Sequence, residues 1–326
     1  MINGCGNGPA VSSKSPVETN PSYSSLNDSI DLYPNDAALY LRRATRLSLA
    51  NAHELAYDDF KKAWSLKSSE DVALPFAANL QILGKNAERL AFLKSSGIKF
   101  PDNQHLQRLL ADAYGASGNN DLALDQYQQI LKRYPKDFES WYEEALLFEQ
   151  LKDTAGAIGA LRNAYELQGV DSYGLELAHL YAEQKNAKAI EICNFILKKD
   201  SGSLLIDPLF IKGIYYSNIK LYPQAIAQFD SCIHRDWKTT DAYLEKGIAY
   251  YHQKNYNAAI HTFNMAVTVS NTDPDAYYWL GRCYEAIHQN ADAISNYQKT
   301  LSLDKSFTDA KEGIQRLQSG FGDASH

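Results

Sequence analysis

Apolar residues recur at the spacing of one helical face through most of this chain. Between about residues 36 and 305, they fall at positions i, i+3, i+4 and i+7 within short segments. That spacing is the pattern of an α-helix with one buried face. Apart from Pro75, which lies inside the segment 70–103, the proline residues of this region stand where helices tolerate them, at expected helix starts (Pro208, Pro223, Pro274) or beyond expected helix ends (Pro101, Pro135). The pattern therefore predicts an all-α chain of short amphipathic helices.

The helical pattern also repeats along the chain at a fixed period. Gly213, Gly247 and Gly281 are 34 residues apart in both steps, and each stands three residues before a tyrosine. A second half follows each glycine at the same offsets, with an Ala-Ile pair, an aromatic residue and then a small residue. Small residues are expected where two helices approach closely, because a larger side chain there would force the pair apart. A 20–50-residue period of this kind indicates stacked helical hairpins.

These residues resemble the tetratricopeptide repeat (TPR) family, whose pattern places an aromatic, Leu-Gly and Tyr in the first helix and Ala, Phe and Ala in the second. The upstream repeats match at Tyr40, Ala44, Leu47, Ala56, Phe60, Ala63; Ala111, Tyr114, Ala123, Tyr127, Pro135; Trp141, Ala145, Phe148, Ala157, Leu161, Ala164; and Leu177, Ala178, Tyr181, Ala189. The match is poorest in 70–103. The resemblance implies a right-handed α-α superhelical solenoid of about eight repeats, at about 37–69, 70–103, 104–137, 138–171, 172–205, 206–239, 240–273 and 274–305.

The two ends of the chain differ from the repeats. Residues 1–35 are rich in Ser, Asn, Gly and Pro without a helical period, so we expect a flexible tether. Residues 306–318 carry Phe307, Ala310, Ile314 and Leu317 on one face. A stack of hairpins ends in an open apolar face, so this segment is expected to form a capping helix, with a structural role favoured over a binding role. Residues 319–326 are expected to be a disordered tail.

Cys5 follows Gly4 at the head of the polar segment, which resembles the start of a mature bacterial lipoprotein whose cysteine carries the lipid. The charged and apolar segments of a secretion signal do not stand before it. Two interpretations stay open: a lipid-anchored protein of the bacterial cell envelope whose start has been trimmed, which is slightly favoured, and a cytosolic protein with an exposed cysteine. An anchor on Cys5 would be the protein's contact with a membrane.

Composition and motifs argue against several other functions. The net charge of -7 and the pI near 5.6 do not favour nucleic acid as a partner. The four cysteines lack the close spacing of a metal site, and no nucleotide-binding, zinc-protease or nucleophile motif is present. Adjacent carboxylates such as Glu143 and Glu144 point about 100° apart on a helix and cannot share a proton. The sequence therefore predicts a non-catalytic protein without cofactor or metal.

The resemblance also implies where a partner would bind, since the first helices of TPR hairpins line a concave groove. The expected groove residues are Tyr142, Glu143, Glu149, His179, Phe210, Leu244, Glu245, His252, Tyr278, Trp279 and Arg282. Leu146, Ile214 and Ile248 also face it, although packing between neighbouring helices is the favoured interpretation for these three. Aromatic anchors usually carry binding energy, so Tyr142, Tyr278 and Trp279 are the favoured contacts.

The groove residues combine apolar and aromatic side chains with carboxylates, which favours an apolar peptide with basic flanks. The Lys/Asn/Arg set with which some TPR domains hold a C-terminal carboxylate is missing at the corresponding positions, such as Tyr142, Leu146 and Glu176. The expected function is a protein-interaction scaffold. The alternatives are a cytosolic TPR adaptor with the same groove and a helical-repeat enzyme, for which the sequence offers no convergent acid and base groups.

Overall fold

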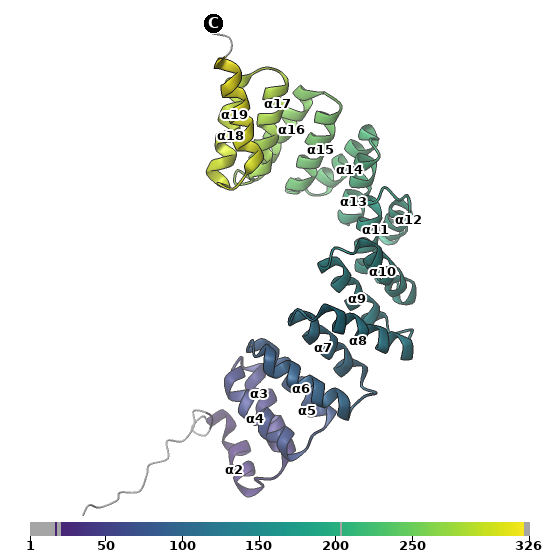
Figure 1. Cartoon of the computed structure of the whole chain (residues 1–326), viewed down its shortest axis with the longest axis vertical. Helices are drawn as coiled ribbons and strands as arrows, with labels where there is room; N and C mark the ends of the chain where they lie inside the picture. The colour runs from purple at the N-terminus through teal and green to yellow at the C-terminus, as the bar shows by residue number, and fades with distance from the viewer. Residues whose placement is uncertain (1–16, 18–20, 203, 323–326) are drawn as a thin grey trace, which may run out of the picture. The chain divides into compact units, whose positions relative to one another are not determined.

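The computed structural model describes residue 17, residues 21–202 and residues 204–322, and helices are its regular elements (Figure 1). None of the described helices is long and apolar enough to span a bilayer. A short 3-10 helix, η1 (Pro21–Tyr23), precedes the α-helices. These are α2 (Ser24–Leu32), α3 (Ala37–Leu49), α4 (His53–Leu66), α5 (Glu70–Ile82), α6 (Asn86–Lys99), α7 (Gln104–Ala116), α8 (Asn120–Arg133), α9 (Phe138–Gln150), α10 (Thr154–Gln168), α11 (Asp171–Glu183), α12 (Lys188–Lys199), α13 (Asp207–Asn218), α14 (Tyr222–Arg235), α15 (Thr240–His252), α16 (Tyr256–Val269), α17 (Pro274–Ala286), α18 (Asn290–Leu303) and α19 (Thr308–Gly322).

The chain divides into two compact units, Met1–Leu151 and Lys152–His326. Unit 1 contains α2 to α9 and unit 2 contains α10 to α19. The division falls inside the expected repeat 138–171, between α9 and α10. Within each unit, successive helices lie side by side, and each first helix packs against the second helix that follows it, as α3 does on α4 and α17 on α18 (Figure 1).

In each hairpin, the two helices come closest at a small residue of the first helix. A Cβ on Gly247 would lie 2.4 Å from Cε1 of the Phe263 ring, which is closer than any real contact. Phe263 is fully buried, so its ring cannot move into solvent. The glycine therefore makes the room that the aromatic ring of the second helix fills. The same relation holds for Gly213 with Phe229 and for Gly281 with Tyr297.

The turn inside a hairpin has a fixed geometry. Three residues separate α5 from α6, and the second of them, Gly84, has φ +66°. The N–H of Lys85 then donates to the carbonyl of Leu80 at 3.0 Å, which caps the end of α5. Only glycine adopts this left-handed conformation freely. Several hairpins place another residue there: Asn51, Lys220, Lys254 and His288.

The expectation of a flexible tether over residues 1–35 is wrong for its second part, because residues 21–32 form η1 and α2. Leu26 and Ile30 stand four residues apart on one helical face and are 4% and 7% exposed. Arg43 ties this helix to the first hairpin: it donates to Asn27 at 2.8 Å and pairs with Asp59 at 2.7 Å. The first hairpin has an open face, and α2 covers it. Residues 1–16, with Cys5, and 18–20 lie outside the described residues.

The expected capping helix forms as α19, which runs from Thr308 to Gly322. Ala310 and Leu317 are buried in one cluster with Tyr297, and Phe307 and Ile314 pack against that cluster. The helix thus covers the last hairpin. It continues through residues 319–322, so the expectation of a disordered tail is wrong for these four residues. The hydroxyl of Ser319 donates to the carbonyl of Arg316 at 3.0 Å. Residues 323–326 lie outside the described residues.

Candidate binding grooves along the first helices

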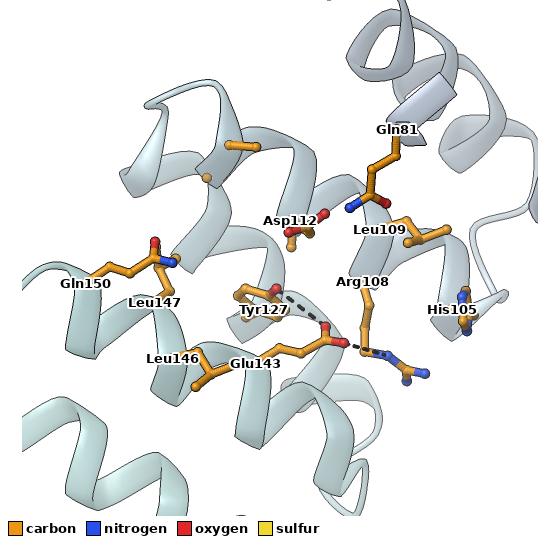
Figure 2. Close-up of a pocket in the computed structure, with 13 residues that line it drawn as sticks. Gln81, His105, Arg108, Leu109, Asp112, Tyr127, Glu143, Leu146, Leu147 and Gln150 are labelled. Atoms are coloured by element: carbon orange, nitrogen blue, oxygen red, sulfur yellow. Dashed lines mark hydrogen bonds and ion pairs between the residues drawn. The ribbon is translucent and has the colours of Figure 1, made fainter. Parts of the chain in front are cut away.

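In unit 1, adjacent hairpins border a cavity of about 470 Å³, shown in Figure 2. Its lining comes from α5, α7, α8 and α9. The first helix α7 contributes His105, Arg108, Leu109 and Asp112, which occupy one face at the i, i+3, i+4, i+7 spacing. From α9 comes Glu143, a residue expected in the groove. We call this hollow the acidic cavity, because several carboxylates lie around its arginine, Arg108.

Arg108 is the fixed cation of the acidic cavity, and carboxylates surround it. Its side chain is 10% exposed and donates to both oxygens of Asp137, at 2.9 and 3.1 Å. It also pairs with Glu139, and its Nε lies 4.0 Å from Glu143. Asp112, on the same helix, is about half exposed at the edge of the cavity. The single guanidinium of Arg108 thus pairs with two carboxylates and lies near a third. Carboxylates therefore outnumber cations at the solvent-facing rim.

Glu143 points into this cavity beside Tyr127 and Arg108 (Figure 2). Burial is the largest influence and raises the pKa of Glu143 to about 7, against the opposing effect of Arg108. The carboxylates of Asp112 and Glu139 raise it further. The hydroxyl of Tyr127 donates to Glu143 at 3.4 Å. A cation placed here by a partner would therefore relieve an unfavourable negative charge.

In unit 2, the first helices α11, α13 and α15 lie against one another and carry a second acidic position. Glu245 on α15 is half-buried, and no ion pair to it forms within residues 204–322 or 21–202. Burial raises the pKa of Glu245 to about 7, and the nearby carboxylates of Asp241 and Glu183 raise it further. Phe210 and Leu244 lie half-buried against the cores of their hairpins. Carboxylates and apolar side chains are thus present together on these helices.

The adjoining end of unit 2 is an aromatic cluster centred on Trp279. Its ring lies 5.2 Å from the ring of Tyr251 and 6.2 Å from that of Phe263. His252 stacks on Tyr222 at 5.8 Å, with 13° between the planes. Burial, with Arg282 and Lys220, lowers the pKa of His252, so its ring is neutral near pH 7. Such rings offer large, rigid contact area to a ligand.

Arg282 lies over this cluster and at the edge of a further cavity of about 470 Å³. Its guanidinium donates to the hydroxyls of Tyr278 at 2.9 Å and Tyr251 at 3.1 Å. Beside it, Glu285 accepts two bonds from Arg316, at 2.7 and 2.9 Å, and one from a tyrosine hydroxyl. The side chains of Arg282 and Glu285 are thereby held in fixed positions.

The remaining expected groove residues differ in how far their side chains are exposed to solvent. Tyr278 is only 7% exposed, because its ring packs on Phe307 at 5.0 Å. Little of that ring is available to a partner, contrary to its choice as a favoured contact. Tyr142 is half-buried, whereas Glu149 and His179 are exposed. The side chains of Ile214 and Ile248 pack against hairpin cores, while Leu146 is exposed at the acidic cavity.

Sequence reasoning missed three charged residues that shape the two cavities, namely Arg108, Asp112 and Arg316, whereas Glu285 stands at an expected groove-facing position. Arg108 and Asp112 stand four residues apart on a predicted first helix, which places them on one face. That spacing was a usable signal. The pairing of Glu285 with Arg316 joins α17 to α19 across 31 residues. No local pattern indicates such a contact.

Paired antiparallel helices, small residues at their crossings and grooves along the first helices define a helical-hairpin repeat protein. Models of the tetratricopeptide repeat match residues 108–171 and 275–304, and a TPR repeat model matches residues 247–287. Residues 108–171 and 247–304 therefore carry tetratricopeptide repeats. No curated protein matches the sequence significantly.

Several solved structures share this fold at low sequence identity. A tetratricopeptide repeat protein from Parabacteroides merdae matches with a TM-score of 0.59 and 17% identity over 76% of this chain and 97% of its own. The C-terminal part of a TPR repeat-containing protein from Cytophaga hutchinsonii gives 0.55 and 14% over 74% and 98%. PilW, a widely conserved type IV pilus biogenesis factor, gives 0.54 and 15% over 67% and 99%. These likenesses concern the fold.

At the general level, tetratricopeptide repeats make this chain a protein-interaction scaffold of a family whose members are typically non-catalytic. The repeats themselves do not identify a partner.

Proposed function

We propose that this protein binds a segment of a partner protein along its first helices, and that the segment combines apolar with basic side chains. The observation that carries the proposal is Glu245, a half-buried carboxylate with a pKa near 7 and two further carboxylates beside it. A lysine or arginine from a partner would offset this charge where burial makes an ion pair stronger than at an exposed site.

The surrounding side chains support the apolar part of the segment. Phe210 on α13 and Leu244, the residue before Glu245 on α15, are half-buried apolar side chains of neighbouring first helices. The rings of Trp279 and His252 extend the surface toward α17. Truncating an aromatic residue at an interface hot spot typically costs about 2 kcal/mol or more in binding free energy. The acidic cavity of unit 1, with Glu143 and the exposed Leu146, repeats the same combination.

The test is a selection of random twelve-residue displayed peptides on the intact chain, followed by calorimetry with the enriched peptides as synthetic probes. Basic residues next to aliphatic or aromatic ones should be enriched. Glu245→Lys should weaken their binding at least tenfold. The matched control is Glu166→Lys, which makes the same charge change at an exposed position of α10 and should leave binding unchanged.

Amidation of the peptide C-terminus should not weaken binding, because the proposed contacts are side-chain contacts. Failure to enrich basic peptides, or equal affinity of the enriched basic peptides for intact and Glu245→Lys proteins, would refute the proposal. A need for the free terminal carboxylate would also refute it.

A further inference from the structure

A second groove runs over unit 1, lined by the second helices α6 and α8 and by the first helix α7 between them. It encloses about 590 Å³ and shares no lining residue with the acidic cavity. The reason is helical geometry: Gln107, Leu110 and Tyr114 stand at i, i+3 and i+7, on a different face of α7 from Arg108 and Asp112. We call it the second-helix groove.

The floor of the second-helix groove is apolar, and one rim exposes a large apolar side chain. Leu110 and Ile130 form the floor and are 7% and 4% exposed. Gly97 adds no side chain above them; a Cβ there would lie 3.4 Å from Leu110 Cδ2. On the rim beside it, Ile98 is 83% exposed. Together, Ile98 and the apolar floor form a contiguous apolar surface, and such surfaces with a polar rim mark interaction sites.

Side-chain hydrogen bonds hold the groove in shape. The amide of Gln107 donates to the carbonyl of Gly97 at 3.0 Å and to that of Phe100 at 3.3 Å. Gln126 on α8 donates in turn to Gln107 at 2.8 Å. The three helices are thus joined through one amide side chain. A preformed groove loses little conformational entropy when it is occupied.

The charge of the rim indicates which partner fits. Lys94 borders the groove with its Nζ 5.1 Å from the centre of the Tyr114 ring, and no ion pair to it forms in the described part of the chain. On the opposite rim, Arg133 pairs with Asp102, and both side chains are more than half exposed, so water screens that pair. The rim therefore favours a carboxylate, the opposite of the acidic cavity.

We propose that the second-helix groove is a second docking surface, which takes an apolar side chain of a partner protein segment whose neighbouring residue is acidic. The apolar side chain lies over Leu110 and Ile130, against Ile98. The carboxylate pairs with Lys94. Because the two surfaces of unit 1 have opposite charge preferences, they would hold two different segments.

The test uses displayed twelve-residue peptides selected on the full chain carrying Glu245→Lys and Glu143→Lys, so that the first-helix surfaces do not compete. Enriched peptides should pair Asp or Glu with Leu, Ile or an aromatic residue. Lys94→Glu combined with Ile98→Asp should weaken them at least tenfold. Both positions are exposed, so the variant should keep its helical circular dichroism.

A matched control changes the same residue types on the first hairpin, Lys62→Glu with Leu49→Asp, where Leu49 is 81% exposed. It should leave binding unchanged. Replacing the peptide's acidic residue by Lys should restore binding to Lys94→Glu alone. The proposal is overturned if no selected peptide responds to the Lys94/Ile98 variant, or if those that respond lack an acidic residue. These acidic peptides differ in charge from the basic peptides expected to bind along the first helices around Glu245. Either proposal can therefore fail without the other.

Discussion

Arg89 donates to the carboxylate of Asp112 at 2.6 Å from a position that other second helices fill with alanine. Arg89 is 2% exposed, while the side chain of Asp112 is about half exposed. Among the residues that the structure describes, no hydrogen-bond partner lies beside the Nε of Arg89. The long side chain thus runs through the core of the second hairpin to reach an acid on α7. This substitution is one of the departures that make the segment 70–103 resemble the repeat pattern least.

The Arg89–Asp112 pair gives the first prediction. Asp112→Asn should lower the free energy of unfolding of unit 1 by about 1–3 kcal/mol, because it leaves a buried guanidinium without a counter-charge. Arg89→Met, which keeps most of the volume and removes the charge, should cost less. Urea denaturation followed by circular dichroism measures both. If Arg89→Met lowers the free energy of unfolding more than Asp112→Asn does, the unpaired charge is not the main cause of the destabilisation.

The close approach of Gly247 and Phe263 gives the second prediction. Gly247→Ala should destabilise unit 2 by about 1–3 kcal/mol, because its Cβ would overlap the ring. Phe263→Leu in the same chain should recover part of that loss, since the smaller side chain frees space. The matched control is Gly159→Ala on α10, where nothing lies within 4 Å. That change should stabilise the helix by about 0.5–1 kcal/mol. Equal effects at both glycines would contradict the packing argument.

A third prediction concerns pH. The pKa values of Glu143, Glu144 and Glu245 are raised to about 7. A carboxyl whose pKa is raised on folding contributes stability that is present below its unfolded value near 4.5 and is lost as the pH rises through about 7. These groups should therefore make the protein less stable at pH 8 than at pH 5.5.

Glu245→Gln isolates one of these groups. It should reduce the loss of stability between pH 5.5 and 8 by about 1–2 kcal/mol, after allowance for partial exposure. His252 acts in the opposite sense, since its pKa is lowered, so only the difference between variant and parent is informative. The measurement is the urea midpoint at each pH. An unchanged pH dependence in Glu245→Gln would show that this carboxylate is solvated.

The fourth prediction concerns α2. Arg43→Met should detach this helix, because Arg43 holds Asn27 and Asp59 together. Amide hydrogen exchange in residues 24–32 should then become at least tenfold faster, with little change in α7 and α8. Arg42→Met, at an exposed neighbouring position, is the control. Slow exchange in α2 of the Arg43 variant would mean that the burial of Leu26 and Ile30 is enough to hold this helix on the first hairpin.

Much of the fold could be predicted because its determinants are local and repeated. The 34-residue spacing of Gly213, Gly247 and Gly281 indicated the hairpins, and their packing on buried aromatic rings gives the physical reason. The candidate site was less predictable. Glu143, Glu245 and Trp279 lie on the expected helices, but Tyr278 turned out to be buried, because Phe307 of the capping segment covers its ring.

The sequence by itself determined the all-α repeat architecture, since helical periodicity and glycine placement act within one hairpin. Tertiary structure decided what depends on side chains from distant segments. It placed α2 on the first hairpin, made Arg108 the centre of an acidic cavity and paired Arg89 with Asp112. These outcomes depend on burial and charge pairing between helices. Neither quantity is set by the order of residues within one helix, because each depends on which neighbours exclude water.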